Sequence, residues 1–250
     1  MSSAPETRDR TPLRGRRLTD ALHTLGRPLL RISFFLYQVE VRRNLYPRDP
    51  LVTEHEGIDP LRVLFAGDVA ASGHGVLSHG LTVVTRTADA LSAATGRGCS
   101  WRVIAKTDLT MAGLAARPSL SAEGVELAFL LLGIPDVLLV TRSEAWARDL
   151  LAVTERIQRE SGLRACRVIV SGIPPLSDFR PIRPAVRRVI DRQVDRLNAI
   201  SVEVAERTPG LTFVPFPSWR IGEMYVKQMF SWKTMHETWA ATLAEAARDR

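Results

Sequence analysis

The chain has 250 residues, of which 45% are hydrophobic and 24% charged, a composition typical of a soluble globular protein with room for one α/β domain. The formal net charge is +7, but residues 1–50 hold ten arginines against five acidic residues, and the remainder is nearly balanced. Because no basic stripe with interleaved aromatic residues is present, the charge argues against specific nucleic-acid binding and indicates a solvated basic tail.

Cysteine content and hydropathy narrow the class of protein further. Cys99 and Cys166 are the only cysteines, too few for a disulfide framework, and no residue spacing resembles a metal site. We therefore expect two buried thiols, no cofactor and no metal. The N-terminus has no apolar segment followed by a small-residue cleavage site, and its longest apolar run, "ISFFLYQVEV", is too short to span a bilayer. These features predict a cytoplasmic protein.

Three segments are predicted along the chain. Residues 1–18 are polar and rich in arginine, and we expect them to be disordered. Residues 19–60 are expected to form an N-terminal helical extension and a linker, and residues 61–250 the main domain.

The helical extension is predicted from apolar residues that recur at three- and four-residue steps up to residue 45. Pro28 is expected to split this pattern into two helices. Packing of the extension on the domain, with Leu29, Ile32 and Leu36 inward, is favoured over an interfacial membrane anchor or a lid. Prolines over residues 46–61 indicate the linker.

Strands and helices then alternate. Five short apolar runs lack period-two alternation, which is typical of strands buried on both faces of a parallel sheet. They are "RVLFAG" (62–67), "WRVIAK" (101–106), "ELAFLLLG" (126–133), "CRVIVSG" (166–172) and "LTFVPF" (211–216). Helical patterns occupy residues 79–95, 143–161, 184–207 and 232–247. The alternation predicts a three-layer, doubly wound α/β fold with a five-stranded parallel sheet, whose site lies in the loops after the strands.

These loops, in order and spacing, resemble the SGNH/GDSL hydrolase family, in particular its single-domain esterase-like members common in actinobacteria. The resemblance covers roughly residues 60–245. It rests on "VLFAGDVAASGHGV", "LSAATGRGCSWRVIAKTDLT", "LLLGIPD" followed by "W", "VIVSGIPPLSDF" and "ETWAATLAEA". It implies an SGNH-hydrolase or flavodoxin-like fold and the chemistry of a serine esterase.

The family's reactive groups are all replaced in this chain. The family has a serine nucleophile after Gly-Asp, an oxyanion hole completed by a glycine amide and an asparagine side chain, and an Asp-x-x-His pair before the last helix. The serine position is Val69, the glycine position is Asp108 and the asparagine position is Pro135. The Asp-x-x-His pair falls on Lys227 and Phe230, in a stretch (225–238) whose register against the family allows a slip.

These replacements remove the chemistry that an esterase needs. Valine cannot act as a nucleophile, and proline has neither a side-chain donor nor an amide hydrogen. Loss of one oxyanion donor alone typically slows such an enzyme by about 10²–10³. The resemblance therefore implies a fold without its catalytic residues, and the protein is expected not to be an enzyme.

Relocated catalytic residues are the alternative. Ser72 with His74 or His236 would serve an esterase or acyltransferase, although loop polar residues or helix caps are the favoured interpretation of these side chains.

The scarce lysines raise a second alternative, since only Lys106, Lys227 and Lys233 occur. Lys227 and Asp108 are predicted to pair across the former site. Binding of an anionic ligand by Lys227 and Lys106, or non-hydrolytic chemistry around Lys227 and Asp108, stays open.

The favoured function is a non-catalytic pseudo-hydrolase that binds a small anionic or acyl ligand, or a protein partner, with weak membrane-surface contact through the basic N-terminus as a further possibility. The residues expected to line its ligand site share the carboxyl edge of the sheet: Asp68, Val69, Lys106, Asp108, Pro135 and Lys227.

Overall fold

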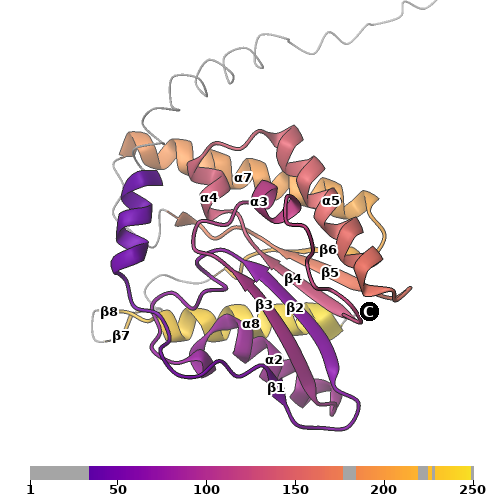
Figure 1. Ribbon diagram of the computed structural model, residues 1–250. Helices are drawn as coiled ribbons and strands as arrows, with labels where there is room; N and C mark the ends of the chain where they lie inside the picture. The colour runs from indigo at the N-terminus through magenta and orange to yellow at the C-terminus, as the bar shows by residue number, and fades with distance from the viewer. Residues whose placement is uncertain (1–33, 177–183, 219–224, 227–228, 249–250) are drawn as a thin grey trace, which may run out of the picture.

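The computed structural model describes residues 34–176, 184–218, 225–226 and 229–248 (Figure 1). Within them lies a six-stranded sheet with the strand order β1-β3-β2-β4-β5-β6. The five parallel strands are β2 (Leu61–Gly67), β3 (Cys99–Ala105), β4 (Leu127–Leu131), β5 (Arg167–Ser171) and β6 (Leu211–Val214). They match the five apolar runs, and the predicted doubly wound α/β fold is confirmed.

The sixth strand, β1 (Glu54–His55), was not predicted. It pairs antiparallel with the edge strand β3, inside the stretch where the prolines indicate a linker. Two residues are too few to show a hydrophobic period, so only the partner strand reveals this pairing.

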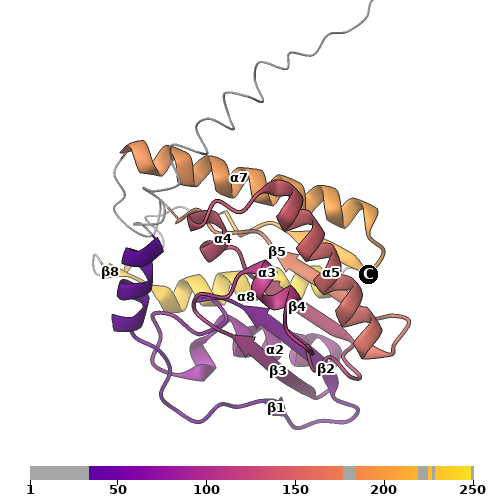
Figure 2. The same ribbon diagram turned by 45° about the horizontal axis from the view of Figure 1, so that its top comes forward.

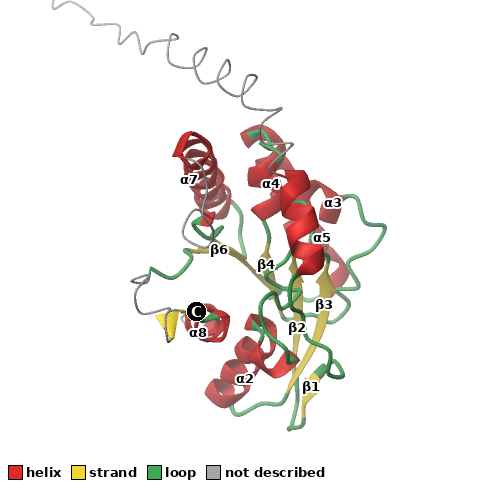
Figure 3. Cartoon of the chain, turned by 90° about the vertical axis from the view of Figure 1, so that its left-hand side faces the viewer, coloured by secondary structure: helices red, strands yellow, loops and turns green. Residues whose placement is uncertain are grey.

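Helices cover both faces of the sheet (Figure 3). One face carries α2 (Val83–Thr95) and α8 (Trp232–Arg248), and the other carries α3 (Met111–Ala115), α4 (Ile134–Leu138), α5 (Ser143–Ser161) and α7 (Pro184–Arg207). Two separate clusters of buried apolar side chains fill the spaces between the layers. This is the three-layer arrangement expected of the predicted fold.

The longer helices lie where the sequence pattern predicted them. The pattern over 79–95 divides into a 3-10 turn, η1 (His79–Leu81), and α2, because the Thr82 side chain caps α2 by accepting a hydrogen bond from the Thr85 amide at 3.2 Å. The short helices α3 and α4 and the hairpin of β7 (Tyr225–Val226) and β8 (Met229–Phe230) were not predicted.

The strand order places a topological switch point beside β2. Taken in chain order, the five parallel strands are arranged 2-1-3-4-5, so the chain winds from β2 to β3 on one side and from β4 onward on the other. Ligands of such sheets bind outside the carboxyl ends of the strands that flank the switch point. Here those are the end of β2, which Asp68 follows directly, and the end of β4, which Leu132 and Gly133 follow.

A helix over the described residues 34–43 stands at this edge of the sheet, drawn in indigo on the left of Figures 1 and 2. Tyr37 and Val41 are buried in the core, so this part of the extension packs on the domain. Leu36 was predicted to face inward, and this prediction is wrong. The residue is 53% exposed, because it lies on the side of the helix away from the buried Tyr37. Leu29 and Ile32 precede the described residues.

Both cysteines are free and buried, as predicted. Among the described residues, no helix combines the length and hydrophobicity that crossing a membrane requires.

Candidate functional site

The first loop of the candidate site begins where β2 ends. Gly67 is required there, because a Cβ atom would lie 2.5 Å from the Ala71 side chain and 2.7 Å from the Leu131 carbonyl oxygen. Asp68 and Val69 follow, and both are buried. The position predicted for the nucleophile therefore holds an aliphatic side chain packed into the protein.

Asp68 joins the first loop to the third. Its carboxylate accepts hydrogen bonds from the Ala70 amide at 3.2 Å, the Gly133 amide at 3.0 Å and the Ile134 amide at 2.9 Å. Only 1% of the residue is exposed, and this burial raises the pKa of Asp68 to about 7, although the three amide donors limit the rise. The side chain is fully engaged in holding two loops together.

Asp136 links the third loop to the second in the same way. It accepts hydrogen bonds from the Met111 amide at 2.9 Å and the Thr141 hydroxyl at 2.8 Å, and burial raises its pKa to about 6. Pro135, at the start of α4, is also buried. The backbone of Gly133 has a φ of 136°, and a Cβ atom there would lie 2.4 Å from Ile173, so the third loop depends on glycine at this point.

Asp108, in the second loop, has partners other than the predicted one. Its carboxylate lies 3.0 Å from the Lys106 ammonium and accepts a hydrogen bond from the Gln38 amide at 3.4 Å. Lys227 lies outside the described residues, so its pairing with Asp108 stays a prediction. The same holds for the side chain of Phe230, of which only the backbone, in β8, is described.

Residues 34–49 pack over the first and second loops, and we call this segment the N-terminal cover. The Tyr37 hydroxyl donates a hydrogen bond to the Thr107 carbonyl at 2.8 Å. Burial, with Asp68 nearby, raises the pKa of Tyr37 far above its usual value, so the phenol is neutral. A hollow of about 140 Å³ remains between the helix of the cover and Lys106, Thr107 and Asp108.

The remainder of the cover follows the first loop. The Asn44 side-chain amide donates to the His74 ring at 2.6 Å, and the Leu45 carbonyl accepts from the Gly75 amide at 2.9 Å. The Asp49 carboxylate then accepts from the Ser78 hydroxyl at 2.8 Å. Sequence periodicity identified the helix but not this role, because Asn44, Leu45 and Asp49 follow the end of the helix and make their contacts through a side-chain amide, a backbone carbonyl and a carboxylate.

Ser72 and His74 do not form a hydrogen-bonded pair. The Ser72 hydroxyl donates to the Asp68 carbonyl at 2.9 Å, one turn earlier in the loop. The His74 ring accepts from Asn44 and packs edge-on against Trp232, with ring centroids 4.6 Å apart. Burial lowers the pKa of His74 to about 4, so the ring is neutral at physiological pH.

His236 is completely buried and joins α8 to the first loop. Its Nδ1 accepts a hydrogen bond from the Val83 amide at 3.2 Å, so Nε2 carries the proton and donates to the His74 carbonyl at 3.0 Å. With both nitrogens occupied, the imidazole cannot take a proton from a hydroxyl while these bonds persist. Burial lowers the pKa of His236 to about 4.

The buried, neutral His236 predicts that the free energy of unfolding decreases in acid. Between pH 6.5 and about 4 the unfolded chain protonates His236 and the folded protein does not, so its contribution to stability is full above pH 6.5 and is lost as the pH falls through 4. The stability gap between wild type and His236→Gln should shrink by up to about 3 kcal/mol across that interval. Urea unfolding at a series of pH values measures it. A gap that does not change with pH would contradict this assignment.

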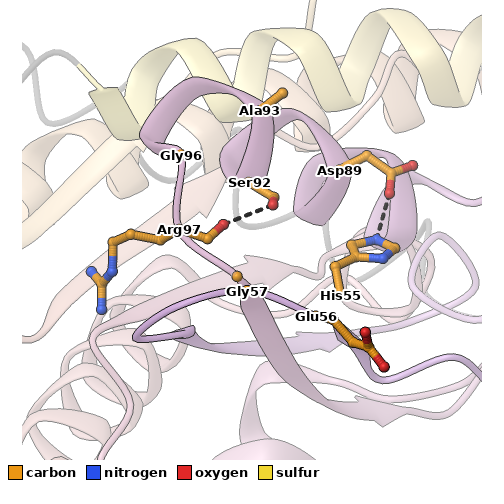
Figure 4. Close-up of a pocket in the computed structure, with 9 residues that line it drawn as sticks. His55, Glu56, Gly57, Asp89, Ser92, Ala93, Gly96 and Arg97 are labelled. Carbon is orange, nitrogen blue, oxygen red and sulfur yellow. Dashed lines mark hydrogen bonds and ion pairs between the residues drawn. The ribbon is translucent and has the colours of Figure 1, made fainter.

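A second hollow, of about 350 Å³, lies at the amino edge of the sheet, beside the end of α2 (Figure 4). Several of the polar residues that line it have partners. His55 lies 2.5 Å from Asp89, the Ser92 hydroxyl donates to the Arg97 carbonyl at 2.7 Å, and the Arg97 guanidinium pairs with Glu126 at 3.0 Å. We see no nucleophile or ligand set here that awaits a partner. Among the described residues, no group of three or more His, Cys, Asp or Glu side chains is placed to hold a metal ion.

Comparison with known proteins identifies the fold. No family model matches the chain, and no curated protein matches its sequence. Among solved structures, the lipase Lip_vut3 from a goat rumen metagenome has a TM-score of 0.59 at 15% identity, covering 76% of this chain and 99% of the lipase.

Two further structures agree with this one. A GDSL-like lipase from Parabacteroides merdae has a TM-score of 0.55 at 16% identity and covers 76% of this chain and 98% of its own length. TesA has a TM-score of 0.54 at 18% identity, with 75% and 98% covered. The chain has the fold of the SGNH/GDSL esterases and lipases.

Proposed function

We propose that this protein is a non-catalytic pseudo-hydrolase, an interaction module built on the SGNH-hydrolase fold. The observation that carries the proposal is the buried Val69 at the carboxyl end of β2, beneath loops that the N-terminal cover closes. In an esterase of this fold, that position must present a reactive hydroxyl to the substrate. A buried isopropyl group offers no lone pair and no proton.

The hydrogen bonds of the cover support the same proposal. The carbonyl of Thr107, the residue before Asp108, accepts from Tyr37, and the first loop is bound to Asn44 and Leu45. A substrate that reached the former reactive edge would have to displace these contacts. The cover therefore favours a closed site over an open one.

The small hollow at the carboxyl edge of the sheet argues against a small ligand at that edge. Pockets for drug-sized ligands usually have volumes of about 300–1,000 Å³. The hollow that the described residues leave beside Asp108 is about 140 Å³. We therefore place the interaction on the outer surface of the protein. The actinobacterial esterase-like branch and a cytoplasmic location stay predictions from the sequence.

The alternative, an esterase or acyltransferase with relocated residues, has less support. Ser72 donates its hydrogen bond to a backbone carbonyl, and His236 uses both ring nitrogens for structural contacts. A relocated mechanism would have to break these bonds before Ser72 met either histidine.

Purified protein is accordingly expected to hydrolyse p-nitrophenyl acetate and butyrate no faster than its Val69→Gly variant, and a fluorophosphonate probe is expected not to label it. An active esterase of the same fold serves as the positive control. Turnover that survives Val69→Gly and disappears in Ser72→Ala would refute the proposal and establish a relocated nucleophile.

A further inference from the structure

The helix over residues 34–43 has a second apolar face, which points away from the domain. Each residue of an α-helix advances the direction of the side chain by about 100°, which places Phe35, Leu36 and Val39 on the side opposite the buried Tyr37. Phe35 is 62% exposed and Leu36 is 53% exposed. A helix packed on a globular domain normally carries polar residues on its outer side. Two large apolar side chains in water at this position therefore call for a partner.

Basic residues accompany this face. Arg42 and Arg43 occupy the last turn of the same helix, and both are exposed. By the helical period, Arg43 projects between Val39 and Leu36. Arg42 projects beside Phe35, at the border between this face and the hollow next to Asp108. Residues 1–50, which include this helix, hold ten arginines against five acidic residues. One exposed carboxylate, Glu40, borders the same side beside Leu36, so two arginines stand against one acidic residue on this helix. The surface thus combines an aromatic ring, aliphatic side chains and a small excess of positive charge.

We propose that this outward face, formed by Phe35, Leu36, Val39, Arg42 and Arg43, binds the surface of an anionic lipid bilayer. Amphipathic helices that lie in a membrane interface bury aromatic and aliphatic side chains near the acyl boundary, while arginines contact anionic headgroups. The long arginine side chains can extend toward the headgroups without withdrawing the apolar residues.

The charge on this face argues against a second copy of the chain as the partner. A two-fold dimer brings the same patch of both copies together, so it would gather two copies of Arg42 and Arg43 in one interface and raise the like-charge density there. An anionic bilayer meets these arginines with opposite charge.

The helix can pack on the domain and contact a membrane at the same time. Tyr37 and Val41 hold its inner face to the protein, while the outer face remains available. The domain would thus present the helix to the lipid in a fixed orientation. This inference does not depend on whether the fold is catalytic.

Flotation with lipid vesicles tests the proposal on the full chain. Vesicles of phosphatidylcholine with phosphatidylserine are compared with vesicles of phosphatidylcholine alone, at low and high salt. Wild type is expected to float with the anionic vesicles and to be released by salt. The double variant Phe35→Ser/Leu36→Ser, which retains every basic residue, should bind about tenfold or more weakly. Arg42→Gln/Arg43→Gln should bind more weakly to anionic vesicles and lose part of its salt dependence.

A matched control is available on α5 and just after it, where Leu151 and Leu163 are exposed leucines. Leu151→Ser/Leu163→Ser should float like wild type, and thermal melting checks that every variant is folded. Three outcomes would overturn the proposal. These are no binding to anionic vesicles, unchanged binding by Phe35→Ser/Leu36→Ser, or a dimer in analytical ultracentrifugation that this variant abolishes. The last outcome would assign the face to a second copy.

Discussion

Replacing Tyr37 with alanine is expected to lower the free energy of unfolding by about 3–5 kcal/mol, the usual cost of truncating a buried aromatic side chain. Tyr37 is only 6% exposed, packs in the larger core cluster and donates a hydrogen bond to the Thr107 carbonyl. Its removal would leave a cavity between the cover and the second loop. Urea unfolding followed by circular dichroism measures the change.

Two variants separate the contributions of Tyr37. Tyr37→Phe keeps the ring and removes only the hydroxyl, so the loss should fall to about 0.5–1.5 kcal/mol. Phe35→Ala, two residues away on the exposed side of the same helix, should alter stability by less than about 0.5 kcal/mol. If Tyr37→Ala proved as mild as Phe35→Ala, the cover would not be part of the folded domain.

A pH-dependent loss of stability is expected from Asp68. Its pKa is about 7 in the folded protein and 3.8 in the unfolded chain, so the folded state binds more protons between these values. The contribution of Asp68 to stability is therefore full below pH 3.8 and is lost as the pH rises through 7. Asp68→Asn does not titrate, and the stability of wild type relative to this variant should decrease by up to about 4 kcal/mol over that interval.

Unfolding in urea at a series of pH values measures this difference. A constant difference between wild type and Asp68→Asn would mean that the amides of Ala70, Gly133 and Ile134 keep the carboxylate ionised throughout. The bracing role of Asp68 would then stand, but its linkage to pH would not.

The local pattern of the sequence predicted the sheet and the long helices. Within "ELAFLLLG", all five residues of β4 are apolar because both faces of the strand are covered, and five residues are enough to show this pattern. The amphipathic period of α5 predicted its bounds, 143–161, without change. The elements that escaped prediction, β1 and β8 among them, are too short to show any period.

The candidate site likewise has residues that the sequence located and contacts that it did not predict. Chain order and spacing were enough to locate Asp68, Val69 and Pro135 at the carboxyl edge, because loops that follow parallel strands converge there. The sequence predicted Lys227 as the partner of Asp108 and did not predict the two partners that the structure shows. Lys106 is only two residues away, and Gln38 lies on a helix seventy residues earlier. No spacing rule connects these two segments.

The sequence by itself determined the α/β fold, because the fold follows from residue identity and local period. It also predicted that Val69 stands where the resemblance expects a reactive serine. Only the tertiary structure decided what the polar residues near the site do. Ser72, His74 and His236 each contain the atoms of a catalytic group, yet their hydrogen bonds are taken by Asp68, Asn44 and Val83. Which face of the helix over 34–43 meets the domain was likewise decided in three dimensions. Apolar residues occupy both faces, so their period cannot choose between Tyr37 and Leu36. The folded protein packs Tyr37 into the larger core cluster and leaves Leu36 exposed.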